Sequence, residues 1–139
     1  MAGHSEEMVR YERGANILFE IALHAGIIHQ NPSHFSMGIR MLKVIAEDFI
    51  KPECVETVLP LYRELIATTK REPLCIAYDL YRDEKDPGHF IFIEEWPDRA
   101  ALDAHCASEH FTRLVPLIDQ HARKAAQYIL MDGQVDPER

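Results

Sequence analysis

The stretch that most constrains the fold is FIFIEEWPDRAALDAHC, which begins at Phe90. In a strand, successive side chains point to opposite faces, so the even-numbered residues from Phe90 to Trp96 share one face. Pro97 has no N–H to give to a sheet and ends the strand. Asp98 is a favourable N-cap for a helix that follows at once. The sequence therefore predicts a strand joined by a short turn to a helix.

Both faces of this strand are apolar. Phe90 and Phe92 lie on one face, and Ile91 and Ile93 lie on the other. A strand that is apolar on both faces is expected to be covered on both. The helices of so small a domain can cover only one face of its sheet. A second subunit that stacks its own sheet on the first would cover the other face, and we therefore predict a homodimer.

Periodicity and turn residues predict the other elements of residues 41–132. The expected strands are 42–50, 74–81, 90–96 and 126–131, and the expected helices run from Glu53 to the Glu72-Pro73 stop, over 98–107, and from Ser108 to about Arg123. Asp86-Pro87-Gly88 predicts a hairpin turn in which Gly88 is free to take a positive φ. The order β-α-β-β-α-(α)-β predicts an α+β fold of the ferredoxin-like split βαβ type, with an antiparallel sheet.

The two ends of the chain differ from this domain. Residues 16–28 form an apolar run, NILFEIALHAGII, that is longer than most strands and favours a helix. We expect residues 1–40 to be a partly helical N-terminal extension that packs on the domain or on a neighbouring subunit. A natural start near Met37 or Met41 is an alternative explanation. Residues 133–139 are expected to be a polar tail.

Composition narrows the class of protein. A chain of 139 residues that is 47% hydrophobic fits one globular domain. The net charge of −8 argues against nucleic acid or an anionic membrane as a partner. Three widely spaced cysteines give no disulfide or zinc pattern. With no secretory signal and no long apolar run, these features predict a cytoplasmic protein.

His105, Glu94 and Trp96 are the candidate functional residues. His105 shares the inner side of its expected helix with Leu102, and an imidazole there can act as a general acid or base. A structural histidine bonded to a backbone carbonyl or to Glu109 is the alternative. Glu94 and Trp96 share one face of the strand and could bind a planar hydroxylated ligand. Alternatively, Trp96 is core and Glu94 pairs with an arginine such as Arg99.

The remaining motifs, and the motifs that the sequence lacks, mainly exclude kinds of chemistry. His105 and Glu109 are spaced to occupy two corners of a metal site, but nothing in the sequence supplies the others, so no metal is expected. His110, at the helix junction before Phe111, fits an exposed histidine better than a functional one. The sequence has no GxGxxG, P-loop or GxSxG motif, and nucleotide-dependent and serine-hydrolase chemistry are not indicated.

The stretch YDLYRDEKDPGHFIFIEEWPDRAALDAHCASEHF resembles the antibiotic biosynthesis monooxygenase family, and in particular its small quinol-monooxygenase-like branch. The EEW that ends the strand, the AL-x-x-H of the helix and the HF that follows carry the resemblance, together with the Glu-Pro at 72–73. It covers about residues 41–132 and implies a dimeric ferredoxin-like α+β barrel.

The resemblance also implies an activity. Some members of that family oxidise quinols or polyphenols with O₂ and without metal, flavin or other cofactor, because a deprotonated dihydroxy aromatic can itself give an electron to O₂. The resemblance thus implies a cofactor-independent monooxygenase. The roles that it implies are His105 as acid/base, Trp96 as a pocket wall, Glu94 as a polar substrate contact, His110 and Phe111 at the entrance, and Tyr78 facing the cavity.

Two other functions stay open. A relative isomerises a phosphorylated metabolite and also uses a histidine in the AL-x-x-H region, so a cofactor-free isomerase of a small carbonyl metabolite, phosphorylated or not, is one alternative. A non-catalytic dimeric ligand-binding module is the other. A haem-degrading branch is disfavoured, because the positions of its functional triad look here like Asp48, His105 and Val115.

Overall fold

The computed structural model describes residues 41–133 of the chain. The predictions for residues 1–40 and for residues 134–139 of the tail lie outside the described residues. The observed elements confirm the predicted order and are, along the chain, β1 (Leu42–Ile50), a 3₁₀ turn η1 (Pro52–Cys54), α2 (Val55–Thr69), β2 (Ala77–Arg82), β3 (His89–Trp96), α3 (Arg99–Cys106), α4 (Glu109–Asp119) and β4 (Ala122–Asp132).

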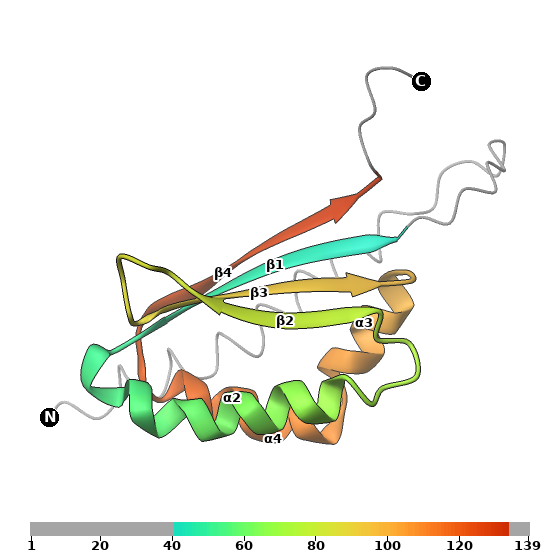
Figure 1. Ribbon diagram of the computed structural model, residues 1–139. Helices are drawn as coiled ribbons and strands as arrows, with labels where there is room; N and C mark the ends of the chain where they lie inside the picture. The colour runs from blue at the N-terminus through green and yellow to red at the C-terminus, as the bar shows by residue number, and fades with distance from the viewer. Residues whose placement is uncertain (1–40, 134–139) are drawn as a thin grey trace, which may run out of the picture. The chain divides into compact units, whose positions relative to one another are not determined.

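The strands of this part of the chain form a four-stranded sheet in the order β2-β3-β1-β4. All of its neighbouring strands are antiparallel, and β1 pairs with β3 on one side and β4 on the other. The helices α2 and α4 lie side by side and cover one face of the sheet (Figure 1). This is the ferredoxin-like α+β arrangement that the sequence predicts.

Strand β3 follows the predicted alternation. Its even-numbered residues, from Phe90 to Trp96, are buried under the helices, and Trp96 is fully buried. On the other face, Ile91 is half-buried and Ile93 is 44% exposed. The described residues therefore cover one of the two apolar faces and leave the other open.

Gly88 is required for close packing rather than for its backbone angle. Among the described glycines, Gly133 has a positive φ and Gly88 does not, so the turn does not use the freedom that the sequence gives Gly88. A Cβ at Gly88 would overlap the carbonyl oxygen of Ile50. The N–H of Ile50 also donates to the Gly88 carbonyl at 2.7 Å, which fastens the β2–β3 hairpin to the end of β1.

Several element boundaries differ from prediction. The helix expected from Glu53 begins as the turn η1, because Pro52 opens that turn before α2 starts. The second strand starts at Ala77 rather than at residue 74, since the N–H of Cys75 donates to the Glu72 carbonyl in a turn. The helix expected to reach about Arg123 ends at Asp119, and β4 is correspondingly longer.

Candidate active site

His105 is placed by a capped helix and enclosed by aromatic rings. The carboxylate of Asp98 accepts from the backbone N–H of Ala101 at 2.8 Å, which confirms the predicted N-cap and sets where α3 begins. The imidazole of His105 is 2% exposed. It lies against three rings, with centroid distances of 4.7 Å to Trp96, 5.0 Å to Phe111 and 5.2 Å to Tyr78. These side chains come from separate segments, so the fold brings together residues that the sequence predicts for the site.

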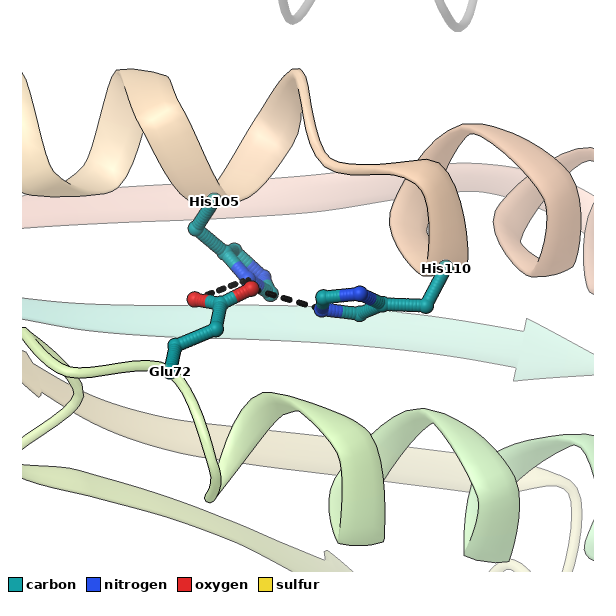
Figure 2. A group of neighbouring side chains, drawn as sticks. All are labelled: Glu72, His105 and His110. Atoms are coloured by element: carbon teal, nitrogen blue, oxygen red, sulfur yellow. Dashed lines mark hydrogen bonds and ion pairs between the residues drawn. The ribbon is translucent and has the colours of Figure 1, made fainter.

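The partner of His105 is Glu72, and sequence reasoning missed it. Nδ1 of His105 lies 3.1 Å and 3.2 Å from the two carboxylate oxygens of Glu72, in the turn after α2 (Figure 2). The alternative partner Glu109 is wrong, because Glu109 is exposed and pairs with Arg113 at 2.7 Å. The Glu-Pro at 72–73 was itself part of the family resemblance, and that was the available signal.

His110 belongs to the same cluster. Ser108 caps α4 by accepting from the N–H of Phe111 at 3.3 Å, and it donates to the carbonyl oxygen of His105 at 2.6 Å. The next turn aims His110 at Glu72, with 2.6 Å between Nε2 and the nearer carboxylate oxygen. His110 is 8% exposed, so the reading of it as an exposed histidine is wrong.

Glu94 forms a pair with Trp96. The two share the buried face of β3, and the indole N–H donates to the Glu94 carboxylate at 2.8 Å. The expected pairing of Glu94 with Arg99 is not what forms, since Arg99 lies beside Asp103. Burial, with a smaller contribution from Asp48 and Glu72, raises the pKa of Glu94 to about 7 against the opposing effect of the indole bond. Near neutral pH this carboxyl can therefore carry a proton and donate a hydrogen bond.

Two further pKa shifts describe the state of the site. Burial lowers the pKa of His105 and outweighs the bond to Glu72, which raises it, so the neutral imidazole is favoured. Burial raises the pKa of the Tyr78 hydroxyl well above its usual value, and this side chain stays a neutral phenol. Tyr78 faces inward as its parity predicts, although Ile76, used as its guide, is exposed.

The cysteines are not part of this chemistry. Cys54, Cys75 and Cys106 are free thiols, as expected from the lack of a disulfide pattern. Burial raises the pKa of Cys106 to about 12, which keeps it in the unreactive thiol form.

Glu72, His105 and His110 are the side chains that could hold a metal ion. One ligand atom from each lies within 4.8 Å of the others in the described part of the chain. A carboxylate with two imidazoles is a donor set that suits zinc or iron. The pair that the sequence offered, His105 with Glu109, does not form. The expectation that the protein needs no metal stays a prediction.

Comparison with known proteins places the chain in a family. Residues 41–117 match the family described as antibiotic biosynthesis monooxygenase, and the chain belongs to that family. A crystal structure of an antibiotic biosynthesis monooxygenase is 69% identical, with a TM-score of 0.67, and the match covers 68% of this chain and 99% of that one. A conserved protein of Methanosarcina mazei Go1 is 31% identical, with a TM-score of 0.65, over 67% of this chain and 92% of its own.

The curated relatives match a shorter part of the chain. An uncharacterized protein of Synechocystis sp., sll1783, is 38% identical over 66 residues, which cover 48% of this chain and 45% of that relative. YcnE of Bacillus subtilis, which bears the provisional name of a monooxygenase, is 30% identical over 66 residues, 48% of this chain and 70% of its own. The chain thus spans less than half of the first of these relatives. The description of the family and the name of YcnE both refer to a monooxygenase.

No helix in the described residues is both long enough and apolar enough to cross a membrane.

Proposed function

We propose that this protein is a cofactor-independent monooxygenase that oxidises a quinol or a similar small hydroxylated aromatic with O₂. The observation that carries the proposal is the state of Nε2 of His105. This nitrogen is buried and has no hydrogen-bond partner among the described residues, on a ring enclosed by Trp96, Tyr78 and Phe111. A buried, unpartnered imidazole nitrogen between aromatic rings is suited to take a proton from a planar aromatic hydroxyl.

The proposed reaction balances without a further reductant. His105 removes a hydroxyl proton from the quinol, and the resulting anion gives one electron to O₂. The superoxide and the semiquinone combine at a ring carbon to form a hydroperoxide. Loss of water from this adduct leaves a hydroxyquinone, so the overall change is quinol plus O₂ to hydroxyquinone plus water. One oxygen atom enters the ring, the other leaves as water, and the substrate supplies all the electrons.

The surrounding residues have proposed roles in binding. Trp96 and Phe111 provide apolar ring surfaces, and burial of an anion among them strengthens its interaction with nearby dipoles. Glu94 in its protonated form can donate to the second oxygen of the substrate while it accepts from the Trp96 indole. Tyr78 adds a neutral phenol to the same wall. His110, first expected at the entrance, is proposed as a contact on the Glu72 side of the cluster.

The assembly and location of the enzyme are part of the proposal. We place it in the cytoplasm, a compartment that keeps free cysteines reduced. We propose a homodimer, supported by the apolar face of β3 that residues 41–133 leave uncovered. The proposed partners are a small aromatic substrate, O₂ and a second copy of the chain.

The test is O₂ uptake with a panel of benzoquinols and dihydroxynaphthalenes, without added metal or flavin. His105→Ala is expected to lower kcat by about 10²- to 10⁴-fold, the range typical of a general base. His121→Asn, which changes a half-buried histidine after α4, is the matched control and should keep full activity. Unchanged turnover in His105→Ala would remove His105 from this role.

The same protein also tests the alternatives. One outcome is that the protein consumes no O₂ with any quinol, while NMR in D₂O shows that it exchanges the proton beside the carbonyl group of a carbonyl compound. The isomerase hypothesis would then replace the monooxygenase hypothesis. If Trp96 fluorescence responds to ligands that are never transformed, the protein is a binding module.

A further inference from the structure

The proposed reaction uses Nε2 of His105 and leaves the other side of that ring unexplained. Nδ1 of His105 faces both oxygens of Glu72 at 3.1 Å and 3.2 Å. Nε2 of His110 faces the nearer of these oxygens at 2.6 Å. Figure 2 shows contacts from the carboxylate to both imidazoles, which extend from α3 and α4 toward the turn after α2. Both imidazoles therefore contact the same carboxylate and share its Oε1.

This geometry decides where the proton of His105 lies. A carboxylate accepts hydrogen bonds, so the nitrogen that faces it must carry the hydrogen. A neutral imidazole has one N–H, and with that N–H at Nδ1 the lone pair is left on Nε2. The nitrogen left as an acceptor is thus the buried one without a partner among the described residues.

We propose that Glu72 is a positioning residue that holds His105 in the tautomer with its Nε2 lone pair directed at the substrate, and that His110 holds Glu72 in place. The inference rests on the proposed function for the identity of the substrate proton. When Nε2 takes that proton, an N–H bond forms and the substrate O–H bond breaks. The imidazolium then has its second N–H against the Glu72 carboxylate, which offsets the new charge.

His110 has a separate part in this arrangement. Its Nε2 lies 2.6 Å from the nearer oxygen of the same carboxylate, so a rotation of Glu72 away from His105 would also break this contact. Ser108 lies 3.2 Å from the same nitrogen of His110 and bonds the His105 carbonyl. The short segment between α3 and α4 therefore fixes the spacing of both histidines.

A divalent cation is the competing occupant of the three side chains, and the hydrogen-bond network is favoured for one reason. A histidine that ligates a metal almost always donates its other ring N–H to a carboxylate, carbonyl or water. For His105 that other atom would be Nε2, and the described residues offer it no acceptor. The neighbours of the His105 ring include the aromatic side chains of Trp96, Tyr78 and Phe111. The site is thus arranged to leave this nitrogen free for a ligand.

The first measurement needs no substrate. Long-range ¹⁵N–¹H NMR of the wild-type protein is expected to show His105, assigned by its loss in His105→Asn, with the hydrogen on Nδ1 at neutral pH. A hydrogen on Nε2 would overturn the inference whatever the activity. The Nδ1 tautomer without turnover of any quinol would support the positioning role and count against the proposed reaction alone, so the two failures are distinguishable.

The second measurement is a variant series on the active enzyme. Glu72→Gln is expected to lower kcat by about 10- to 100-fold with little change in KM, and Glu72→Asp should recover part of the loss. The acid limb of kcat/KM should move to lower pH in Glu72→Gln, because the carboxylate raises the pKa of His105 against the effect of burial and of His110. Glu64→Gln, an exposed glutamate of α2, is the control.

An acid limb that stays in place in Glu72→Gln would reduce Glu72 to a structural residue and overturn the inference. Titration of the metal-free protein with Zn²⁺ or Co²⁺ provides the remaining check. Binding of one equivalent that disappears in both Glu72→Gln and His110→Asn would also overturn it and assign the three side chains to a metal. Should Glu72→Gln fail to fold, as judged by circular dichroism, the wild-type NMR and the metal titration still decide.

Discussion

A buried carboxyl whose main partner is an indole N–H carries a pH dependence that an exposed carboxyl does not. The pKa of Glu94 rises from 4.5 to about 7, chiefly through burial. Between these values the folded protein binds more protons than the unfolded chain, so the free energy of unfolding falls as pH rises through this window. At alkaline pH, a shift of this size lowers the free energy of unfolding by on the order of 3 kcal/mol.

Glu94→Gln is therefore expected to be more stable than the wild type at about pH 8.5 by on the order of 2–3 kcal/mol, and not at about pH 5. The amide oxygen of glutamine can still accept from the Trp96 indole. Urea unfolding at both pH values measures the difference. Glu95→Gln, on the opposite face of β3 and paired with Lys43 at 2.6 Å, is the control. A difference between Glu94→Gln and wild type that does not change with pH would contradict the raised pKa.

Single residues also mark how far the sequence predicts the site. His105, Trp96 and Tyr78 follow from helical and strand periodicity, because periodicity determines which side chains face inward. Glu72 does not, since it lies in a turn, where no period applies, and meets His105 across 33 positions of the chain. Its pairing depends on how α2 and α3 pack, which only the fold determines.

At the scale of elements, the position of His105 depends on where α3 begins. The Asp98 side chain satisfies a backbone N–H that would otherwise have no partner at this helix end. Asp98→Ala is expected to cost about 1 kcal/mol of folding free energy. Chemical denaturation measures it. Asp98→Asn keeps an acceptor oxygen and should lose only a few tenths of the free energy that Asp98→Ala loses. An equal loss in both variants would show that the cap oxygen does not stabilise the helix.

The end of α4 shows the opposite case, in which local sequence misleads. The residues after Asp119 are compatible with a longer helix, but from Ala122 they form strand β4, which pairs with β1. Phe49 pairs with Lys124 across the sheet, and the ammonium of Lys124 lies 3.8 Å from the centroid of the Phe49 ring. Arg123 also pairs with Asp86 of the hairpin turn. These contacts join residues that are distant in sequence, so neither helical nor strand periodicity predicts them.

For the whole molecule, the order of elements was predictable because each strand and helix has its own period and stop signal. The sheet order β2-β3-β1-β4 then follows from the split βαβ topology. What the described unit leaves open is the face of the sheet away from the helices. Ile93 there is 44% exposed, and Ile129 and Met131 of the edge strand β4, which the register across β1 places on the same face, are 50% and 37% exposed. Contiguous apolar surface of this kind is typical of an interface.

The proposed homodimer predicts what happens when that face is charged. Ile93→Glu places a carboxylate on it without altering the buried face of β3, so the chain should still fold but lose its partner, because an unpaired charge would be buried on association. Size-exclusion chromatography with light scattering is expected to give about twice the chain mass for the wild type and the mass of one chain for Ile93→Glu. Leu117→Glu, on α4 and 40% exposed, is a matched control that should remain dimeric. A monomeric wild type at micromolar concentration would overturn the dimer, and a dimeric Ile93→Glu would move the interface away from this face.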